Sequence, residues 1–253
     1  TTLGSTGASI SVGSFSGSGT YVPGSNVLTE IVSTQTSYTY PGSTTKASAR
    51  DDCAGTTCTY NEEMTNYANW WTYYRTRMQM MKTAASQAFS VLGTDFRLGY
   101  ISINNTTGTD FLNVADITTT TTGQKKLWYD KLVAANPNSS TPLRGTLSKV
   151  GRYYAGKFSG SKINGVTATD PMQYACQRNY TILSTDGYWN ESGTPTRIDG
   201  TTAIGDQDSA STIARPYLDG QAQSNTLADV AYYYYNTDIR SSTFSNTNNS
   251  QGL

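Results

Sequence analysis

Two polar side chains, a hydroxyl and a carboxylate, follow elements that often carry ligand sites. Asp186 directly follows the run 179–185, whose β-branched and apolar residues are typical of a buried strand. Thr141 precedes a helix predicted from Pro142, so its hydroxyl lies near the first free amides of that helix. Open α/β sheets place ligand sites at the carboxyl ends of their strands. Because hydroxyl and carboxylate oxygens are ligands for hard cations, Thr141 and Asp186 together predict a cation site.

Each of these two residues also has a plain structural interpretation. Thr141 is a good N-cap for the predicted helix, because a threonine hydroxyl can accept from an amide of the first turn. Asp186 followed by Gly187 is typical of a turn after a strand. These roles are compatible with a cation site, so both interpretations stay open.

Histidine is absent from the chain, and its absence argues against most hydrolase chemistry. Without imidazole there is no Ser-His-Asp or Cys-His arrangement and no ordinary general base near neutral pH. A glycosidase would need two facing carboxylates, but Glu62 and Glu63 are adjacent on a predicted helix and do not face each other. We therefore expect a protein that is not an enzyme.

The charge composition argues against nucleic acid and membrane partners. Charged residues make up 14% of the 253 residues, the formal net charge is zero and the pI is about 6.2. Such a chain lacks the positive charge that binding to a phosphate backbone requires. No apolar run approaches the ~20 residues that span a bilayer. Residues 1–4 do not resemble a signal peptide, so we expect a mature or excised segment.

The three cysteines indicate the compartment. Cys53 and Cys58 are five positions apart, a spacing that a small loop-closing disulfide can bridge, and Cys176 is distant in sequence. A structural disulfide is favoured over two free thiols, and three scattered cysteines without histidine make a poor zinc site. A disulfide would mean an exported protein, with Cys176 either free or paired outside the chain.

The first third of the chain predicts an arm followed by a long helix. Residues 1–40 are rich in Gly, Ser and Thr, with short strands expected at 8–12 and 27–32. A helix is predicted at 62–92, opened by a capping box at 59–62. Its apolar residues recur in steps of three and four, and we expect this stripe to lie along a sheet or helical core.

The rest of the chain alternates between strands and helices. The expected elements are strands at 97–103 and 111–115, a helix at 124–136, a helix from 142 to about 156, the strand within 179–185 and a helix at 224–235. Residues 187–220 are polar and predict an insertion made of loops. This alternation indicates an α/β fold with a doubly wound, mainly parallel sheet covered by helices on both faces.

Several longer motifs resemble the PilC/PilY family of type IV pilus biogenesis factors and tip adhesins. They lie at 53–66, 68–70, 73–78 and 182–190, and the likeness covers roughly 38–190 and resumes at 226–240. The resemblance implies a von Willebrand factor A-like domain, Rossmann-like in its sheet. Residues 1–40 would be an arm or insertion, 41–240 the core and 241–253 a polar tail.

The resemblance also implies a metal-ion-dependent adhesion site. Thr141 matches the threonine of that site and Asp186 matches its aspartate, whereas the family's Asp-x-Ser-x-Ser loop occurs nowhere in this sequence. In the family that loop follows a first central strand, which would lie upstream of Thr1, and a calcium-binding β-propeller follows downstream. Thr141 and Asp186 are thus an incomplete ligand set for Mg²⁺ or Ca²⁺.

By this resemblance the chain is expected to be an exported adhesion and assembly module at a type IV pilus tip, on the cell surface. Its expected partners are pilus minor subunits and a host or abiotic surface receptor, bound through loops at the carboxyl end of the sheet with the help of a cation. The alternative is a purely structural filament or surface-layer component with no metal role.

Overall fold

The computed structural model divides into two compact units, residues 1–84 and 85–253. The residues that it describes are 9–15, 21–27, 31–38, 52–104, 110–136, 140–174, 177–185, 187–208 and 223–240. Asp186, Cys176 and the predicted tail at 241–253 therefore lie outside the described residues. Among the described residues, no helix is both long and apolar enough to cross a membrane.

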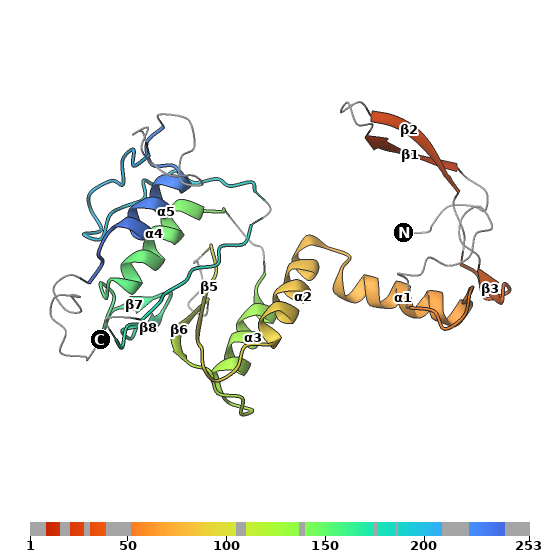
Figure 1. The fold of residues 1–253 in the computed structure, drawn as a ribbon, viewed down its shortest axis with the longest axis horizontal. Coiled ribbons are helices and arrows are strands. Elements are labelled where there is room, and N and C mark those ends of the chain that lie inside the picture. The colour runs from red at the N-terminus through yellow and green to blue at the C-terminus, as the bar shows by residue number, and fades with distance from the viewer. Residues whose placement is uncertain are drawn as a thin grey trace. The chain divides into compact units, whose positions relative to one another are not determined.

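The first unit contains two antiparallel strand pairs and a helix (Figure 1). The elements are β1 (Ser9–Phe15) paired with β2 (Tyr21–Val27), β3 (Ser37–Tyr38) paired with β4 (Cys58–Thr59), and α1 (Tyr60–Tyr73). The strand expected at 8–12 is confirmed by β1. Of the strand expected at 27–32, Val27 ends β2 and residues 31 and 32 are not in a strand, while residues 28–30 lie outside the described residues.

The start of α1 is fixed by the predicted capping box, which is confirmed. Thr59 Oγ1 accepts from the backbone N–H of Glu62 at 3.3 Å, and a Glu62 carboxylate oxygen accepts from the backbone N–H of Thr59 at 2.8 Å. Two amides that would otherwise lack a partner are thereby satisfied.

The single long helix expected at 62–92 is wrong, because the chain forms α1 and a separate α2 (Arg77–Ser90). A second capping box starts α2. Thr76 Oγ1 accepts from the N–H of Gln79 at 3.2 Å, and Gln79 Oε1 accepts from the N–H of Thr76 at 3.0 Å. The Thr-x-x-Gln pattern is a start signal in its own right. The apolar stripe, which continues through the break, concealed it.

The expected packing of that stripe against a core is wrong for α1, which has no buried residue. The end of α2 does lie against α3 (Gln124–Ala134), where the Phe89 ring stacks on the ring of the buried Trp128 with the centroids 4.5 Å apart. The exposed apolar and aromatic side chains on these helices are Met64, Tyr67, Trp70, Trp71, Tyr73 and Met80, and Tyr74, the C-cap of α1, is exposed as well. On α1 the rings contact one another instead, with the Tyr67 ring centroid 5.9 Å from that of Trp70 and 6.0 Å from that of Trp71.

The second unit combines two strand pairs with three further helices. Its elements are β5 (Arg97–Ile101), β6 (Phe111–Asp116), α3 (Gln124–Ala134), α4 (Leu143–Tyr154), β7 (Lys162–Ile163), β8 (Val166–Thr167) and α5 (Leu227–Asn236). A core cluster forms where Phe111, Tyr153, Ile163 and Ala168 pack together. α3 lies on the β5–β6 pair, and its Gln124 side chain donates to the Leu98 carbonyl oxygen at 2.6 Å.

The α/β, doubly wound, von Willebrand factor A-like fold is contradicted. Every strand pair in the described part of the chain is antiparallel and two-stranded. The connection 102–110 between β5 and β6 shows why, since it is shorter than the dozen or more residues that a parallel crossover needs. The alternation of strands and helices could be read from the sequence, but the short connection between β5 and β6 does not allow these two strands to pair in parallel.

The buried strand expected at 179–185 is wrong as well. Residues 177–185 follow an open course without helix or strand, and Tyr180 and Ile182 are 74% and 76% exposed. No strand in the described part of the chain pairs with this stretch. The local preference for β structure is present in the sequence, but the neighbouring strand that would bury it is not found there.

The two helices α4 and α5 pack closely at a glycine. A Cβ on Gly151 of α4 would lie 2.3 Å from the Tyr234 ring, so the absence of a side chain lets that ring rest on the helix. The Tyr234 hydroxyl donates to the Thr196 carbonyl oxygen at 2.8 Å. Burial raises the pKa of Tyr234 to about 12, so it stays protonated and keeps α5 joined to the 196 loop.

Candidate functional site

The amino end of α4 is the place where the sequence predicted Thr141 to act, and Thr141 does lie there. The helix begins at Leu143, with Pro142 as its N-cap and no side-chain capping bond, so the N-cap role predicted for Thr141 is wrong. Instead the backbone N–H of Thr141 donates to Asn190 Oδ1 at 2.6 Å, and the two residues form an isolated antiparallel bridge. Thr141 thus joins the start of α4 to the 187–193 loop.

A glutamate that the sequence analysis did not single out caps the helix. The Glu191 carboxylate accepts from the backbone N–H of Arg144 at 3.1 Å and from that of Gly145 at 2.8 Å. Its side chain is only 6% exposed. A carboxylate is favoured at a helix N-terminus by the free amides and by the helix dipole. The anion-binding end of α4 is therefore occupied by the chain's own carboxylate.

Arg144 ties this cap to two further segments. Its Nε lies 3.3 Å from a Glu191 carboxylate oxygen, and its guanidinium donates to the carbonyl oxygens of Asn225 and Gly193 at 2.9 and 3.3 Å. The guanidinium carbon lies 4.4 Å from the centroid of the Trp189 ring. A planar, always-charged group with several donors suits such a junction.

The exposed part of this junction is aromatic. Tyr188 is 85% exposed and Trp189 is 48% exposed, although Arg144 covers one side of the Trp189 ring. We call residues 188–191 together with Thr141 and Arg144 the α4 rim. Its backbone is held by Glu191 and Asn190, so its aromatic side chains are presented from a braced loop.

Asp186 lies outside the described residues, so its distance from Thr141 is not defined here. Asn190, four positions after Asp186 in the sequence, forms the bridge with Thr141. The cation site of Thr141 and Asp186 therefore stays a prediction. Glu191 and Arg144 belong to none of the motifs found in the sequence, and Asn190 is the last residue of the motif 182–190, but only the contacts among the three in the folded chain reveal their role.

A second group of carboxylates gathers at the start of α5. Oxygens of Asp206, Asp208 and Asp229 lie within 4.8 Å of one another, and the latter two residues are buried. Asp229 is already used as a cap, since it accepts from the N–H of Thr226 at 2.8 Å and from that of Gln207 at 2.6 Å. Oxygen clusters of this kind suit hard cations, but here the first role of Asp229 is to start the helix.

The loop that carries Asp206 is closed by a reciprocal pair of hydrogen bonds. The backbone N–H of Gly205 donates to Asn225 Oδ1 at 2.9 Å, and the backbone N–H of Asn225 donates to the Gly205 carbonyl oxygen at 3.0 Å. Both residues have positive φ, 79° for Gly205 and 65° for Asn225. Glycine and asparagine are the residues that adopt this conformation most readily.

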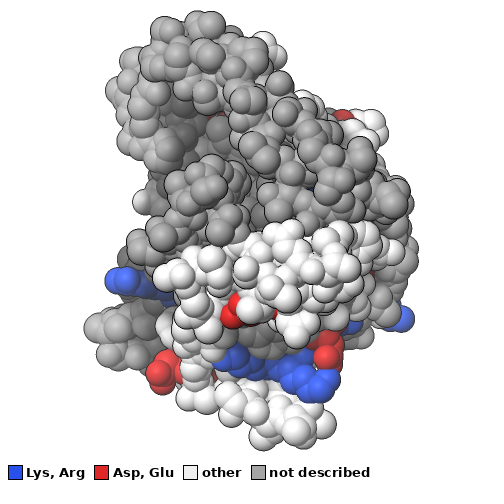
Figure 2. Space-filling model, turned by 90° about the vertical axis from the view of Figure 1, so that its right-hand side faces the viewer, with Lys and Arg blue, Asp and Glu red and all other residues white. Residues whose placement is uncertain are grey.

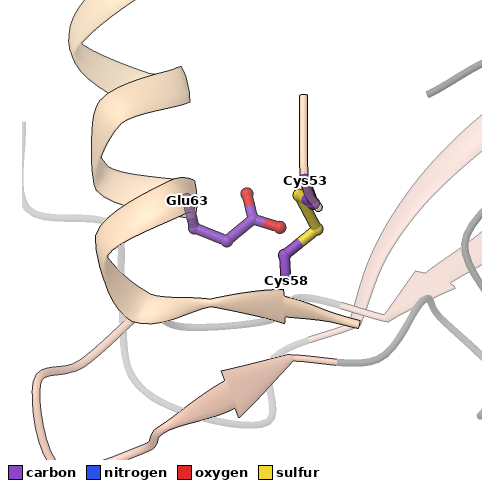
Figure 3. A group of neighbouring side chains, drawn as sticks. All are labelled: Cys53, Cys58 and Glu63. Carbon is purple, nitrogen blue, oxygen red and sulfur yellow. A yellow bond between two sulfur atoms is a disulfide. The ribbon is translucent and has the colours of Figure 1, made fainter. Parts of the chain in front are cut away.

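The predicted disulfide is confirmed. Cys53 and Cys58 are bonded, and the Glu63 side chain points toward the two sulfur atoms (Figure 3). The loop is fastened to α1, because Glu62 accepts from the backbone N–H of Ala54 at 2.8 Å as well as from that of Thr59. Bonded sulfurs are not thiolate ligands, so in this form the group is a structural staple and not a zinc site.

Charges on the described surface are mixed in sign. Figure 2 shows Lys and Arg side chains lying close to Asp and Glu among uncharged residues. This agrees with a formal net charge of zero. A surface of this kind recognises partners by local shape and hydrogen bonding more than by a long-range field.

Comparison with known proteins identifies relatives among pilus proteins. No family model matches the chain, and no solved structure matches it. The type IV pilus biogenesis factor PilY1 of Pseudomonas aeruginosa PAO1 is 31% identical over 224 residues, which is 80% of this chain and 18% of PilY1. PilY1 of strain PAK is 33% identical over 186 residues, which is 69% of this chain and 16% of that protein. The chain is therefore a distant homologue of PilY1 that spans less than a fifth of the length of these relatives.

Proposed function

We propose that this chain is part of an exported pilus-assembly and adhesion protein at the tip of a type IV pilus, without enzymatic activity. The observation that carries the proposal is the distant homology to PilY1, a type IV pilus biogenesis factor, over most of the chain. The disulfide supports export, because such bonds persist in oxidising compartments. We propose that the α4 rim contacts a pilus minor subunit or a host or abiotic surface.

The geometry of the rim supports a binding role. Tyr188 and Trp189 offer large amphipathic side chains, which provide contact area at low entropic cost. The buried Glu191–Arg144 pair holds the loop beneath them, so less order has to be gained on binding. Exposed aromatic residues on a braced loop are typical of binding hot spots.

The test of the rim is a pair of matched substitutions. In a pull-down of purified pilus minor subunits by the 253-residue chain, Tyr188→Ser with Trp189→Ser should weaken capture at least tenfold. The control is Tyr235→Ser, which removes another exposed tyrosine, 72% exposed on α5, and should leave capture unchanged. Equal capture by all three proteins would contradict a role for the rim.

We further propose that Mg²⁺ or Ca²⁺ assists binding, held in part by Thr141 and Asp186 and completed by an acidic group of the partner. Hydroxyl and carboxylate oxygens fit either ion. A cation at 100 times its dissociation constant would add about 2.7 kcal/mol to the free energy of unfolding. Thermal melting in millimolar Mg²⁺ or Ca²⁺ should therefore exceed melting in chelator, and Asp186→Asn should abolish the difference. Identical curves would contradict cation binding by this chain in the absence of the partner.

A structural role in a filament or surface layer, without a cation, is the second candidate. The aromatic residues exposed along α1 favour this structural role, because an exposed apolar patch often marks a surface that contacts another protein. Under this alternative, Trp70→Ser with Trp71→Ser would impair assembly, while the rim substitutions and chelation would not.

A further inference from the structure

The side chain of Glu63 points at the disulfide, although the start of α1 does not require it to do so (Figure 3). Glu62 completes the capping box, and Glu63 is its neighbour in the first turn. The helix dipole favours an acidic residue in this turn but does not decide which way its side chain turns. A carboxylate oxygen of Glu63 lies within 4.8 Å of both sulfur atoms. We call Cys53, Cys58 and Glu63 the Cys–Glu group.

In the oxidised form the two sulfur atoms offer the carboxylate no interaction that would hold it beside them. Bonded sulfurs have no proton to donate and carry no charge that would attract an anion. Reduction changes this, because a free cysteine carries a proton and its thiolate is a metal ligand. Two thiolates and a carboxylate at close range repel one another, and a divalent cation between them removes that repulsion.

The spacing of the group suits zinc. Four residues separate Cys53 from Cys58, and zinc sites typically take two cysteines with two to four residues between them. Tetrahedral zinc holds sulfur at about 2.3 Å and carboxylate oxygen at about 2.1 Å, which places its ligand atoms about 3.4–3.8 Å apart. The three atoms of the group already lie within 4.8 Å of one another. Rotation of the side chains is therefore sufficient to form the site once the sulfurs are no longer bonded.

The surroundings of the group also favour a cation. Asp52 Oδ1 lies 4.0 Å from Cys53 Sγ, and its other carboxylate oxygen accepts from Asn66 Nδ2 at 2.7 Å, so a second negative charge is held beside the sulfur. Both cysteines are buried, which limits the access of water to their sulfurs. Carboxylates attract cations in general, whereas thiolates favour zinc over harder ions such as Mg²⁺ and Ca²⁺.

We propose that the Cys–Glu group binds one zinc ion when the disulfide is reduced, through the two thiolates and the Glu63 carboxylate, with water in the fourth position. The disulfide and the zinc ion are then alternative ways to close the loop 53–58. A chain is synthesised with free thiols, and its disulfides form in an oxidising compartment. The zinc form therefore belongs to the time before oxidation, when it holds the loop closed beside α1.

The exchange between the two forms balances in atoms and electrons. Oxidised glutathione takes two electrons from the two thiolates, so its own sulfur–sulfur bond breaks, the bond between Cys53 and Cys58 forms and zinc is released. In the reverse direction a water-soluble phosphine supplies the two electrons and becomes a phosphine oxide, with its oxygen taken from water. The two cysteines take the protons of that water and lose them when zinc binds.

A Co²⁺ titration of the phosphine-reduced 253-residue chain tests the site, in a Cys176→Ser background that leaves two thiols. One equivalent of Co²⁺ should produce a thiolate-to-metal charge-transfer band and the visible bands of tetrahedral cobalt, and Zn²⁺ should remove both. Glu63→Gln should weaken binding at least tenfold. Asp130→Asn, which changes an exposed carboxylate on α3, should leave binding unchanged. The oxidised chain should show neither band.

Unfolding in guanidinium provides a second measurement on the same proteins. Reduction without metal should lower the stability, and Zn²⁺ should restore it in the Cys176→Ser chain but not when Glu63→Gln is added, because only a bound ion stabilises the folded state. Oxidised glutathione should release one zinc ion for each disulfide formed. A reduced chain without a charge-transfer band overturns the proposal. Equal affinity with and without Glu63→Gln also overturns it, because the two thiols would then bind metal without the carboxylate.

Discussion

At the scale of single residues, Gly145 shows how a helix end can depend on one missing side chain. It is the third residue of α4, and a Cβ at this position would lie 2.5 Å from Glu191 Oε1. That oxygen accepts from the Gly145 amide itself at 2.8 Å. The glycine thus allows a buried carboxylate to approach the backbone closely enough to cap the helix.

We predict that Gly145→Ala destabilises the protein by about 1–3 kcal/mol, because the added methyl displaces the Glu191 carboxylate from the amides it caps. The sign is informative, since glycine to alanine inside a helix normally stabilises by up to about 1 kcal/mol. Urea unfolding measures the change. Gly93→Ala is the control, because a Cβ there meets nothing within 4 Å. Equal effects of the two substitutions would contradict the close approach.

Asp170 and Arg240 make the second residue-scale contact with a testable consequence. The Arg240 guanidinium is hydrogen-bonded to both oxygens of Asp170 and to the Tyr154 carbonyl oxygen at the end of α4. These hydrogen bonds lower the pKa of Asp170 below its ordinary value of 3.8. The folded state therefore binds this proton less readily than the unfolded chain does.

A carboxyl group with a lowered folded pKa contributes stability that is present above pH 3.8 and lost as the pH falls through the folded value. We predict that the free energy of unfolding of the unmodified protein drops between pH 5 and pH 2.5 more steeply than that of Asp170→Asn. Asp130→Asn, which alters an exposed pair with Lys126, should keep the steep slope. Parallel slopes for Asp170→Asn and the unmodified protein would be inconsistent with the ion pair.

At the scale of elements, the disulfide loop and α1 behave as one piece. Cys53 and Cys58 close a short loop, and Glu62 binds that loop to the first turn of the helix. The loop is small, so the chain-entropy account gives about 2 kcal/mol of stabilisation. We predict that Cys53→Ser with Cys58→Ser lowers the stability by about this amount, and that dithiothreitol has the same effect on the unmodified protein. Guanidinium unfolding with and without reductant checks it, and reductant should not alter the double variant.

The elements also show what the sequence could and could not reveal. Capping at Thr59 and the helix at α3 follow local patterns, because caps and apolar periodicity act within a few residues. The helix α5 was also predicted, but its expected cap at Ser224 is wrong, since Thr226 caps it. The break between α1 and α2 had a local signal at Thr76 that a continuous stripe outweighed. The segment 179–185 could not be placed from its own residues, since a strand is defined by its neighbours and not by its composition.

The candidate site repeats this distinction. Thr141 was expected at the start of a helix and lies just before α4, but its capping role passed to Glu191, fifty positions away from it in sequence. Contacts such as Glu191 with Gly145 are long-range, and a single sequence carries no periodic signal for them. The sequence shows which residues are charged, but it does not show which of them come into contact in the folded protein.

At the scale of the whole molecule, the sequence predicted the relation to a protein family but not the fold. The motifs at 53–66 and 182–190 predicted a relation to pilus biogenesis factors, and the homology to PilY1 agrees with it. The fold class inferred from the same resemblance was wrong, because every described strand pair is antiparallel. Short motifs can remain recognisable between related proteins even where the strand pairing inferred from them is wrong.

The reciprocal hydrogen bonds between Gly205 and Asn225 have a practical consequence. They keep the two ends of the intervening stretch adjacent, whatever length of chain connects them. Doubling the length of a flexible loop adds only about 0.6 kcal/mol to the cost of closing it. An epitope tag or a fluorescent label inserted between Gly205 and Asn225 should leave α4 and α5 undisturbed, because these two residues hold the ends of the insertion together, which would provide a handle for imaging or purification.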